Sequence, residues 1–213
     1  MGRRIDEWAD ERERMVDRLR AGGIRDERVL TAMRTVPRER FVASEWASEA
    51  YAEQALPIAA GQTISAPKIV ALMAAELELT GDERVLEVGA GSGYACAVLS
   101  HLAREVVGVE MHEELAASAR ALLDELGYAN VELRTGDGTR GAPDRAPFEG
   151  ISVAAMAGNL PGALVEQLAP GGTLICPVRD AAGGHGDLVR YRDGQTESLA
   201  PVAFVPLMET PDE

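Results

Sequence analysis

The chain has 213 residues, of which 46% are hydrophobic, and its formal net charge is −14, from 35 acidic and 21 basic side chains. This length and apolar content suffice for one well-packed unit, so we expect a single domain over residues 1–213. The acidic balance excludes general nucleic-acid binding, because a phosphate backbone requires a positive protein surface.

The start of the chain, MGRRIDEWADERERMVDRLR, is charged and contains no apolar segment. We therefore expect no signal peptide. No apolar run approaches the roughly 20 residues that a membrane-spanning helix needs. The two cysteines, Cys96 and Cys176, fall within predicted regular structure and do not suggest a disulfide framework. The expectation is a soluble cytoplasmic protein with no membrane partner.

Residues 5–35 are predicted to form two helices. Gly22-Gly23 is expected to end the first helix and Asp26 to cap the second. A third short helix is expected over residues 44–52. Together these helices form a helical N-terminal cap, residues 1–60.

The stretch GQTISAPK, at residues 61–68, places two hydroxyl side chains on a proline-containing turn. Ser65 is expected to cap the helix that follows, since Ala66 and Pro67 suit the first turn of a helix. The apolar residues after Pro67 recur at helical spacing.

From residue 84 onward the pattern alternates between strands and helices. This alternation implies a parallel sheet covered by helices on both faces. The expected strands cover residues 84–88, 105–110, 131–134, 150–154 and 173–177, and the expected helices cover residues 94–103, 113–126 and 161–168.

The C-terminal part departs from this alternation. Residues 187–192 and 199–207 read as two strands joined by a turn at Asp193-Gly194, which predicts an antiparallel edge. The fold class is therefore α/β, with a mostly parallel seven-stranded sheet, an antiparallel last strand and a helical N-terminal extension. Residues 61–213 form the expected core and C-terminal hairpin.

The segment VLEVGAGSGY, at residues 85–94, is the strongest local signal. A strand runs into a glycine turn that opens a helix, which presents backbone amides to a bound nucleotide cofactor. Glu110 ends the next strand, about 20 residues on, where a carboxylate can accept both ribose hydroxyls. Asp137-Gly138 follows the third strand, in line for the adenine side.

The residue at position 94 separates two cofactor classes. The dinucleotide fingerprint G-x-G-x-x-G/A, counted from Gly89, would place Tyr94 where close helix–strand packing requires a small residue. The pattern acid-x-Gly-x-Gly-x-Gly, starting at Glu87, instead looks like the S-adenosylmethionine loop, in which the acid lies near the amino-acid end of the cofactor. Methyl transfer is therefore favoured over hydride transfer.

Several segments, in this order and spacing, resemble the protein-L-isoaspartate O-methyltransferases: RMVDRLRAGGIRDERVLTAMRTVPRERFV, GQTISAP, VLEVGAGSGY, GDGTRG, APFEGISV, LVEQLAPGGTLICPV and VAFVPL. The resemblance spans nearly the whole chain, and its TIS turn is specific to that family. It implies a Rossmann-like class I fold dependent on S-adenosylmethionine. It also implies a monomer that methylates the free carboxylate of isoaspartyl residues in damaged proteins or peptides and so starts repair through a succinimide.

The resemblance also implies roles for individual residues. In the family the TIS turn closes over the methyl group, so Ser65 is the expected catalytic residue beside the substrate carboxylate. Substrate binding is expected at Ile64, Ser65 and Met156, and cofactor binding at Gln62, Thr63, Glu87, Gly89, Ala90, Gly91, Gly93, Glu110, Met111, Asp137 and Gly138. The three histidines show no second ligand at metal spacing, so no metal site is predicted.

The chain departs from the family pattern at five positions, which are Glu53, Ala59, Met156, Gly158 and Arg179. The departures leave the expected cofactor site intact and affect the expected substrate side, where Met156 could reshape a peptide groove. Met156, Gly158 and Arg179 motivate an alternative enzyme that methylates an ordinary aspartate of a dedicated peptide. Two further alternatives are a non-catalytic S-adenosylmethionine-binding protein and, with Tyr94 against it, an NAD-binding oxidoreductase.

Overall fold

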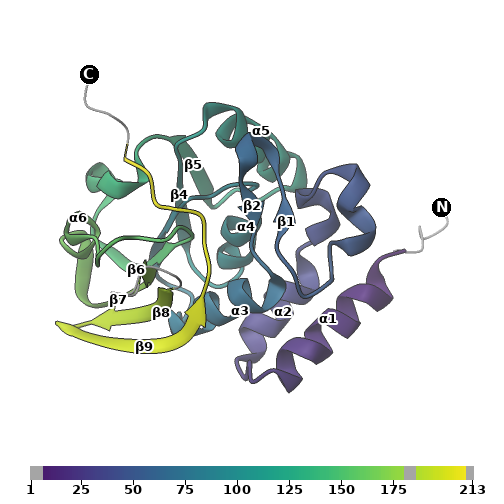
Figure 1. Ribbon diagram of the computed structural model, residues 1–213, viewed down its shortest axis with the longest axis horizontal. Helices are drawn as coiled ribbons and strands as arrows, with labels where there is room; N and C mark the ends of the chain where they lie inside the picture. The colour runs from purple at the N-terminus through teal and green to yellow at the C-terminus, as the bar shows by residue number, and fades with distance from the viewer. Residues whose placement is uncertain (1–6, 180–185, 210–213) are drawn as a thin grey trace.

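The computed structural model describes residues 7–179 and 186–209. Its central sheet contains β3 (Arg84–Val88), β4 (Glu105–Glu110), β5 (Val131–Thr135), β6 (Phe148–Val153), β7 (Leu168–Arg179), β8 (Gly186–Arg192) and β9 (Gln195–Val202). The strand order is β5-β4-β3-β6-β7-β8-β9 (Figure 1). The strands from β5 to β7 pair in parallel, whereas β8 and β9 add an antiparallel edge. The predicted fold class is confirmed.

The α-helices are α1 (Ala9–Ala21), α2 (Glu27–Thr35), α3 (Pro67–Glu76), α4 (Tyr94–Ser100), α5 (Glu113–Leu126) and α6 (Gly162–Val165). Short 3-10 turns are η1 (Arg38–Phe41), η2 (Ser44–Glu49), η3 (Ala59–Gly61), η4 (Gly138–Arg140) and η5 (Pro143–Arg145). A two-stranded sheet of β1 (Leu56–Pro57) and β2 (Thr63–Ile64) precedes α3.

The two faces of the sheet are covered unequally. Alternate strand residues enter two separate apolar clusters, so that Val85 packs on one face and Leu86 on the other. The first cluster contains most of the buried residues of helices α1 to α5. The second contains α6, which has four residues, and the chain around Ala142. The prediction of helices on both faces is therefore only partly right, because the connection from β5 to β6 forms 3-10 turns.

Local signals explain the best-predicted helices. The Asp26 side chain accepts hydrogen bonds from the backbone N–H groups of Arg28, at 2.8 Å, and Val29, at 3.4 Å, which caps α2 as expected. Helix α2 ends before Pro37, since the residue before a proline disfavours helical geometry. Helix α5 has the predicted bounds and ends at Gly127, whose φ of 83° suits a left-handed cap.

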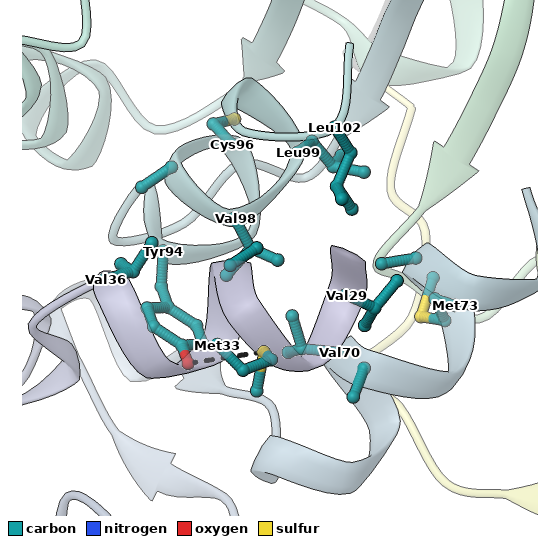
Figure 2. Close-up of a cluster of buried hydrophobic side chains, with 14 of the residues drawn as sticks. Val29, Met33, Val36, Val70, Met73, Tyr94, Cys96, Val98, Leu99 and Leu102 are labelled. Carbon is teal, nitrogen blue, oxygen red and sulfur yellow. Dashed lines mark hydrogen bonds between the residues drawn. The ribbon is translucent and has the colours of Figure 1, made fainter. Parts of the chain in front are cut away.

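Helix α2 joins the N-terminal layer to the core. Figure 2 shows Val29 and Met33 of α2 facing Val70 of α3 and Tyr94 of α4. The hydroxyl of Tyr94 lies 3.6 Å from the sulfur of Met33, and the Tyr94 ring meets Phe41 edge to face with centroids 5.6 Å apart. The N-terminal helices thus share one buried cluster with the helix that follows the glycine loop.

The last strand differs from its prediction, which covered residues 199–207. Strand β9 begins at Gln195 because Asp193 and Gly194, at φ 49° and 79°, form a tight turn that pairs Gln195 directly with Arg192. It ends at Val202. The following segment crosses the molecule, as the yellow chain in Figure 1 shows. It pairs with Met156, which lies just beyond the carboxyl end of β6.

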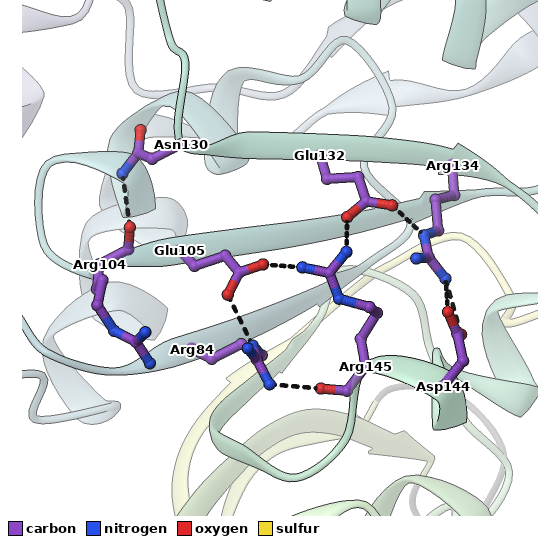
Figure 3. A network of polar contacts seen from close by, with 8 residues as sticks. All are labelled: Arg84, Arg104, Glu105, Asn130, Glu132, Arg134, Asp144 and Arg145. Atoms are coloured by element: carbon purple, nitrogen blue, oxygen red, sulfur yellow. Dashed lines mark hydrogen bonds and ion pairs between the residues drawn. The ribbon is translucent and has the colours of Figure 1, made fainter.

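The amino ends of three parallel strands are joined by a network of ion pairs (Figure 3). Arg145, from η5, pairs with both Glu105 and Glu132. The Nε atom of Arg84 lies 2.7 Å from a carboxylate oxygen of Glu105, and Nε of Arg134 lies 2.6 Å from Glu132. The network therefore fixes the edge of the sheet opposite the carboxyl ends of these strands.

We expect Arg145→Gln to lower the free energy of unfolding by about 1 kcal/mol, because two carboxylates lose their shared cation in a partly exposed network. The loss should shrink in high salt, which screens such pairs. Denaturant unfolding at low and high salt measures both effects. Arg14→Gln, which breaks the more exposed pair with Glu11 in α1, is the control; an equal loss in both variants would contradict the network's contribution.

None of the helices within residues 7–179 and 186–209 has both the length and the apolar character that crossing a bilayer requires.

Candidate active site

The direction of chain winding changes between β3 and β6, and a cleft opens there. The two strands are parallel neighbours, and Gly89 and Ala154 are the first residues beyond their carboxyl ends. Connections from β3 and from β6 depart to opposite sides, which leaves a crevice at the strand ends. A Cβ atom at Gly89 would lie 3.7 Å from the backbone of Ala154, so the glycine borders the narrow floor of this crevice.

The cleft consists of two adjoining cavities. They meet at four shared residues, which are Thr63, Gly89, Gly91 and Ala154. Further residues of the first cavity are Ile64, Ser65, Glu87, Ala90, Ser92, Tyr94 and Ser152. Further residues of the second are Gln62, Glu110, Met111, His112, Gly138 and residues 205–208. Together they form one elongated site, which we call the cleft.

The glycine loop forms the border between the two cavities. Its glycines at 89, 91 and 93 have φ values of 81°, 54° and 86°, a region that side-chain-bearing residues rarely adopt. The N–H of Gly89 donates to the carbonyl of Val109 at 2.8 Å, which ties the loop to β4. Gly91 would place a Cβ atom 3.3 Å from Ile58, so the β1–β2 hairpin lies directly against the loop.

Glu110 lies at the end of β4 and lines the second cavity, as predicted for a ribose-binding acid. It is 5% exposed, and its two oxygens accept hydrogen bonds from the N–H groups of Gly91, at 2.8 Å, and His112, at 2.9 Å. Each carboxylate oxygen can accept a second bond. The carboxylate therefore both fixes the glycine loop and retains acceptors for a ligand's hydroxyls.

Glu87 is a buried acid in the wall of the first cavity. It is 1% exposed, and its Oε2 has no hydrogen-bond partner among the described residues. Burial raises the pKa of Glu87 to about 8, and a hydrogen bond with Ser152 lowers it in part. An unpaired carboxyl oxygen at a cavity wall is suited to a ligand that brings a hydrogen-bond donor or a positive charge.

The TIS turn brings Ser65 to the first cavity, where its side chain is half-buried. The prediction that Ser65 caps α3 is wrong, because Ala66 occupies the N-cap position and provides no side-chain bond. A carboxylate from an earlier segment of the chain caps the helix instead. Oε1 of Glu53 accepts a hydrogen bond from the N–H of Lys68 in the first turn, at 3.0 Å. The hydroxyl of Ser65 thus has no capping role.

Three of the residues predicted for the site do not line the cleft. Gly93 begins α4, and a Cβ there would lie 3.2 Å from Leu123 of α5. The carboxylate of Asp137 accepts bonds from the N–H and the hydroxyl of Thr139, at 2.8 and 2.6 Å, and so shapes the turn that presents Gly138. Met156 is buried at 6% exposure, with its backbone paired to the C-terminal segment.

The cleft also contains residues that the sequence did not single out. His112 follows Glu110 closely, and its ring nitrogen lies 3.4 Å from the side-chain nitrogen of Gln62. Ser152 contacts Glu87 from the neighbouring strand. Residues 205–208 close the second cavity from the C-terminal side. Only the strand-end position of His112 was a usable sequence signal, because the other contacts depend on the order of strands in the sheet.

The remaining departures from the family pattern lie at the edge of the site. Arg179 ends β7 as an exposed residue, and its N–H donates to the carbonyl of Ala157 at 2.9 Å. Gly158 is exposed, with no atom near the position of a Cβ. Ala59 begins the 3-10 turn η3 within the β1–β2 hairpin. In the described ranges, no group of three or more His, Cys, Asp or Glu side chains is arranged for a metal ion.

The sheet order, the glycine loop and the acid at the end of β4 define the class of S-adenosylmethionine-dependent methyltransferase folds. The family model described as Protein-L-isoaspartate(D-aspartate) O-methyltransferase (PCMT) matches residues 10–212, and the chain belongs to this family. A relative from Anaeromyxobacter sp. (strain Fw109-5), "Protein-L-isoaspartate O-methyltransferase 2", is 52% identical over 205 residues, which cover 92% of this chain and 83% of the relative.

Two solved structures share the fold. One, named protein-L-isoaspartate O-methyltransferase, matches with a TM-score of 0.84 at 26% identity, over 92% of this chain and 65% of its own chain. The other, from Plasmodium falciparum, is named "putative protein-L-isoaspartate O-methyltransferase beta-aspartate methyltransferase (PCMT)" and is in complex with S-adenosyl-L-homocysteine. It has a TM-score of 0.82 at 24% identity and covers 93% of this chain and 99% of its own. The fold prediction and the family resemblance are thus confirmed.

We expect Glu87→Gln to flatten the pH dependence of stability between about pH 5 and 8. In the folded protein the pKa of Glu87 is raised from 4.5 to about 8, so in this window the folded state keeps a proton that the unfolded state has released. Its contribution to stability is therefore fully present below pH 4.5 and is lost as the pH rises, by at most about 1.4 kcal/mol per pH unit.

Denaturant unfolding of the ligand-free protein at several pH values measures this slope. Glu114→Gln, the same substitution at an exposed position of α5, is the control. Parallel stability curves for wild type and Glu87→Gln would show that the buried carboxyl does not retain its proton in the folded state.

Proposed function

We propose that this protein transfers a methyl group from S-adenosylmethionine to the free carboxylate of L-isoaspartyl residues in damaged proteins and peptides, which initiates repair through a succinimide. The observation that carries the proposal is that Ser65 of the TIS turn lies in the same cavity as Glu87 and the glycine loop. Family membership supports the substrate class and the cofactor.

The residues of the cleft fit S-adenosylmethionine. The buried and unpaired Oε2 of Glu87 suits the amino group of the cofactor's amino-acid end. The carboxylate of Glu110 has acceptors left for ribose hydroxyls. Gly138 lines the same cavity, and glycine lets its turn pack against β3, since a Cβ there would lie 2.6 Å from Val88. S-adenosylmethionine supplies an activated methyl group on its sulfonium centre.

The chemistry places modest demands on the protein. A carboxylate is already ionised at neutral pH, so no general base is needed to activate it. The protein must hold the carboxylate oxygen in line with the methyl group and exclude competing water. The hydroxyl of Ser65 can donate one hydrogen bond to the carboxylate, which orients it without the strong charge that would weaken its nucleophilicity.

The described structure gives no specific observation for the dedicated-peptide alternative. Met156, the substitution that most suggested it, is packed against the start of β8, and Arg179 lies at the exposed end of β7. The NAD-dependent alternative conflicts with membership of a methyltransferase family. Methylation of isoaspartyl residues is therefore the function that the site supports best.

The test of this function is transfer of labelled methyl from S-adenosylmethionine to two matched peptides, one isoaspartyl and one aspartyl. We expect labelling of the isoaspartyl peptide alone. Its free carboxylate is attached directly to Cα, whereas the free carboxylate of the aspartyl peptide is separated from Cα by one methylene group. Equal labelling of both peptides would favour the dedicated-peptide enzyme. Cofactor binding without labelling of either would favour a non-catalytic binding protein.

Ser65→Ala should lower kcat/KM for the isoaspartyl peptide by roughly 10- to 100-fold, the effect of losing one hydrogen bond to a charged group. The dissociation constant of S-adenosylmethionine, measured by calorimetry, should change much less, since Ser65 is expected to contact substrate. Ser198→Ala, on exposed β9, is the matched control. Equal losses of activity and cofactor affinity would rule out the substrate-orienting role of Ser65.

A further inference from the structure

Arg38, the first residue of η1, is a fully buried arginine with 0% of its surface exposed. Burial lowers the pKa of its guanidinium, while Tyr94 and Glu53 favour the charged form. Arginine nevertheless stays protonated at neutral pH in proteins. A positive charge therefore lies inside the molecule, and its removal from water must be offset by the groups around it.

These groups belong to three separate segments of the chain. The Nε atom donates to the carbonyl of Ala50 at 2.6 Å, and Nη2 donates to the carbonyl of Ser65 at 2.8 Å. The guanidinium carbon lies 4.6 Å from the centroid of the Tyr94 ring, a cation–π distance. Ser65 and Tyr94 both line the first cavity. Arg38 therefore contacts two lining residues from the side that faces away from the cavity.

The third guanidinium nitrogen, Nη1, is buried and has no hydrogen-bond partner among the described residues. Such an orphaned donor on a charged group is costly in a protein interior. Its positive charge acts through a medium of low polarity, in which charges interact more strongly than in water. An anion at the Ser65 turn would partly offset this cost.

We propose that Arg38 is a positioning residue of the methyl-transfer reaction: it fixes Ser65 relative to the glycine-loop helix, and its buried charge favours a carboxylate at the Ser65 turn. The inference rests on the proposed function, because it assigns the anion to the isoaspartyl substrate. It gives the N-terminal helical layer a part in the reaction, although this layer contributes no residue to the cleft's lining within the described ranges.

A purely structural role would also place an arginine between the N-terminal layer and the core, and Arg28 provides the comparison. Its Nη2 donates to the carbonyl of Leu102 at 3.0 Å, and its Nη1 donates to the carbonyl of Leu79. Arg28 thus bridges two main-chain carbonyls, as Arg38 does, but neither of them lines the cleft. Arg28 is exposed, so Arg28→Met is the control for the loss of an arginine bridge to the core, and Arg38→Lys is the control for the buried position.

The experiment compares Arg38→Met, Arg38→Lys and Arg28→Met by steady-state kinetics on the isoaspartyl peptide, by calorimetric binding of S-adenosylmethionine, and by thermal unfolding. We expect Arg38→Met to lower kcat about 10- to 100-fold and to raise the peptide KM several-fold, with cofactor affinity nearly unchanged. Arg38→Lys should recover KM, because it keeps the charge, but not kcat, because it loses the planar fork. Arg28→Met should leave both constants near wild type.

Two results would overturn the role of Arg38. One is a loss of kcat in Arg38→Met that is no larger than in Arg28→Met. The other, which applies even if Arg38→Met does not fold, is an Arg38→Lys variant with the kcat of wild type. Failure of the wild-type protein to methylate the isoaspartyl peptide is a distinct outcome, since it would overturn the proposed function first and this inference with it.

Discussion

The cleft depends on one backbone reversal, in which the chain leaves buried β3 and enters α4 over residues 89–93. Three glycines at positive φ make this reversal possible, and any side chain there would be strained. The loop is then held by β4, through hydrogen bonds to the carbonyl of Val109 and the carboxylate of Glu110. The turn thereby forms the border that the two cavities of the cleft share.

The same reversal explains why the N-terminal helices dock where they do. Tyr94 is the first residue of α4, and its ring points into the N-terminal layer between Phe41 and Met33. From the sequence alone, Tyr94 indicated only that the glycine loop does not match the dinucleotide fingerprint. In the structure its bulk is what joins the helical layer to the glycine loop, so the layer and the loop share one buried cluster.

The parts of the fold that were predicted well have local causes. Strands 84–88 and 105–110 and helix 113–126 have their predicted bounds, because apolar runs and Gly127 mark their ends. The site residues at strand ends, such as Glu110, follow from the same reasoning. The bounds of β9 and the closure of the second cavity by residues 205–208 could not be predicted, because they depend on how distant segments pair.

The capping of α3 shows how a distant contact changes the meaning of a local motif. Read locally, Ser65 before Ala66-Pro67 is a helix cap, and a capping hydroxyl would be committed to the backbone. Glu53, twelve positions before Ser65, takes over that role, because its carboxylate accepts a hydrogen bond from the N–H of Lys68 in the first turn of α3. The hydroxyl of Ser65 then remains at the cavity wall. Under the proposed function, a remote acid thus releases the serine for the substrate, which is a division of roles that no reading of GQTISAPK alone could reveal.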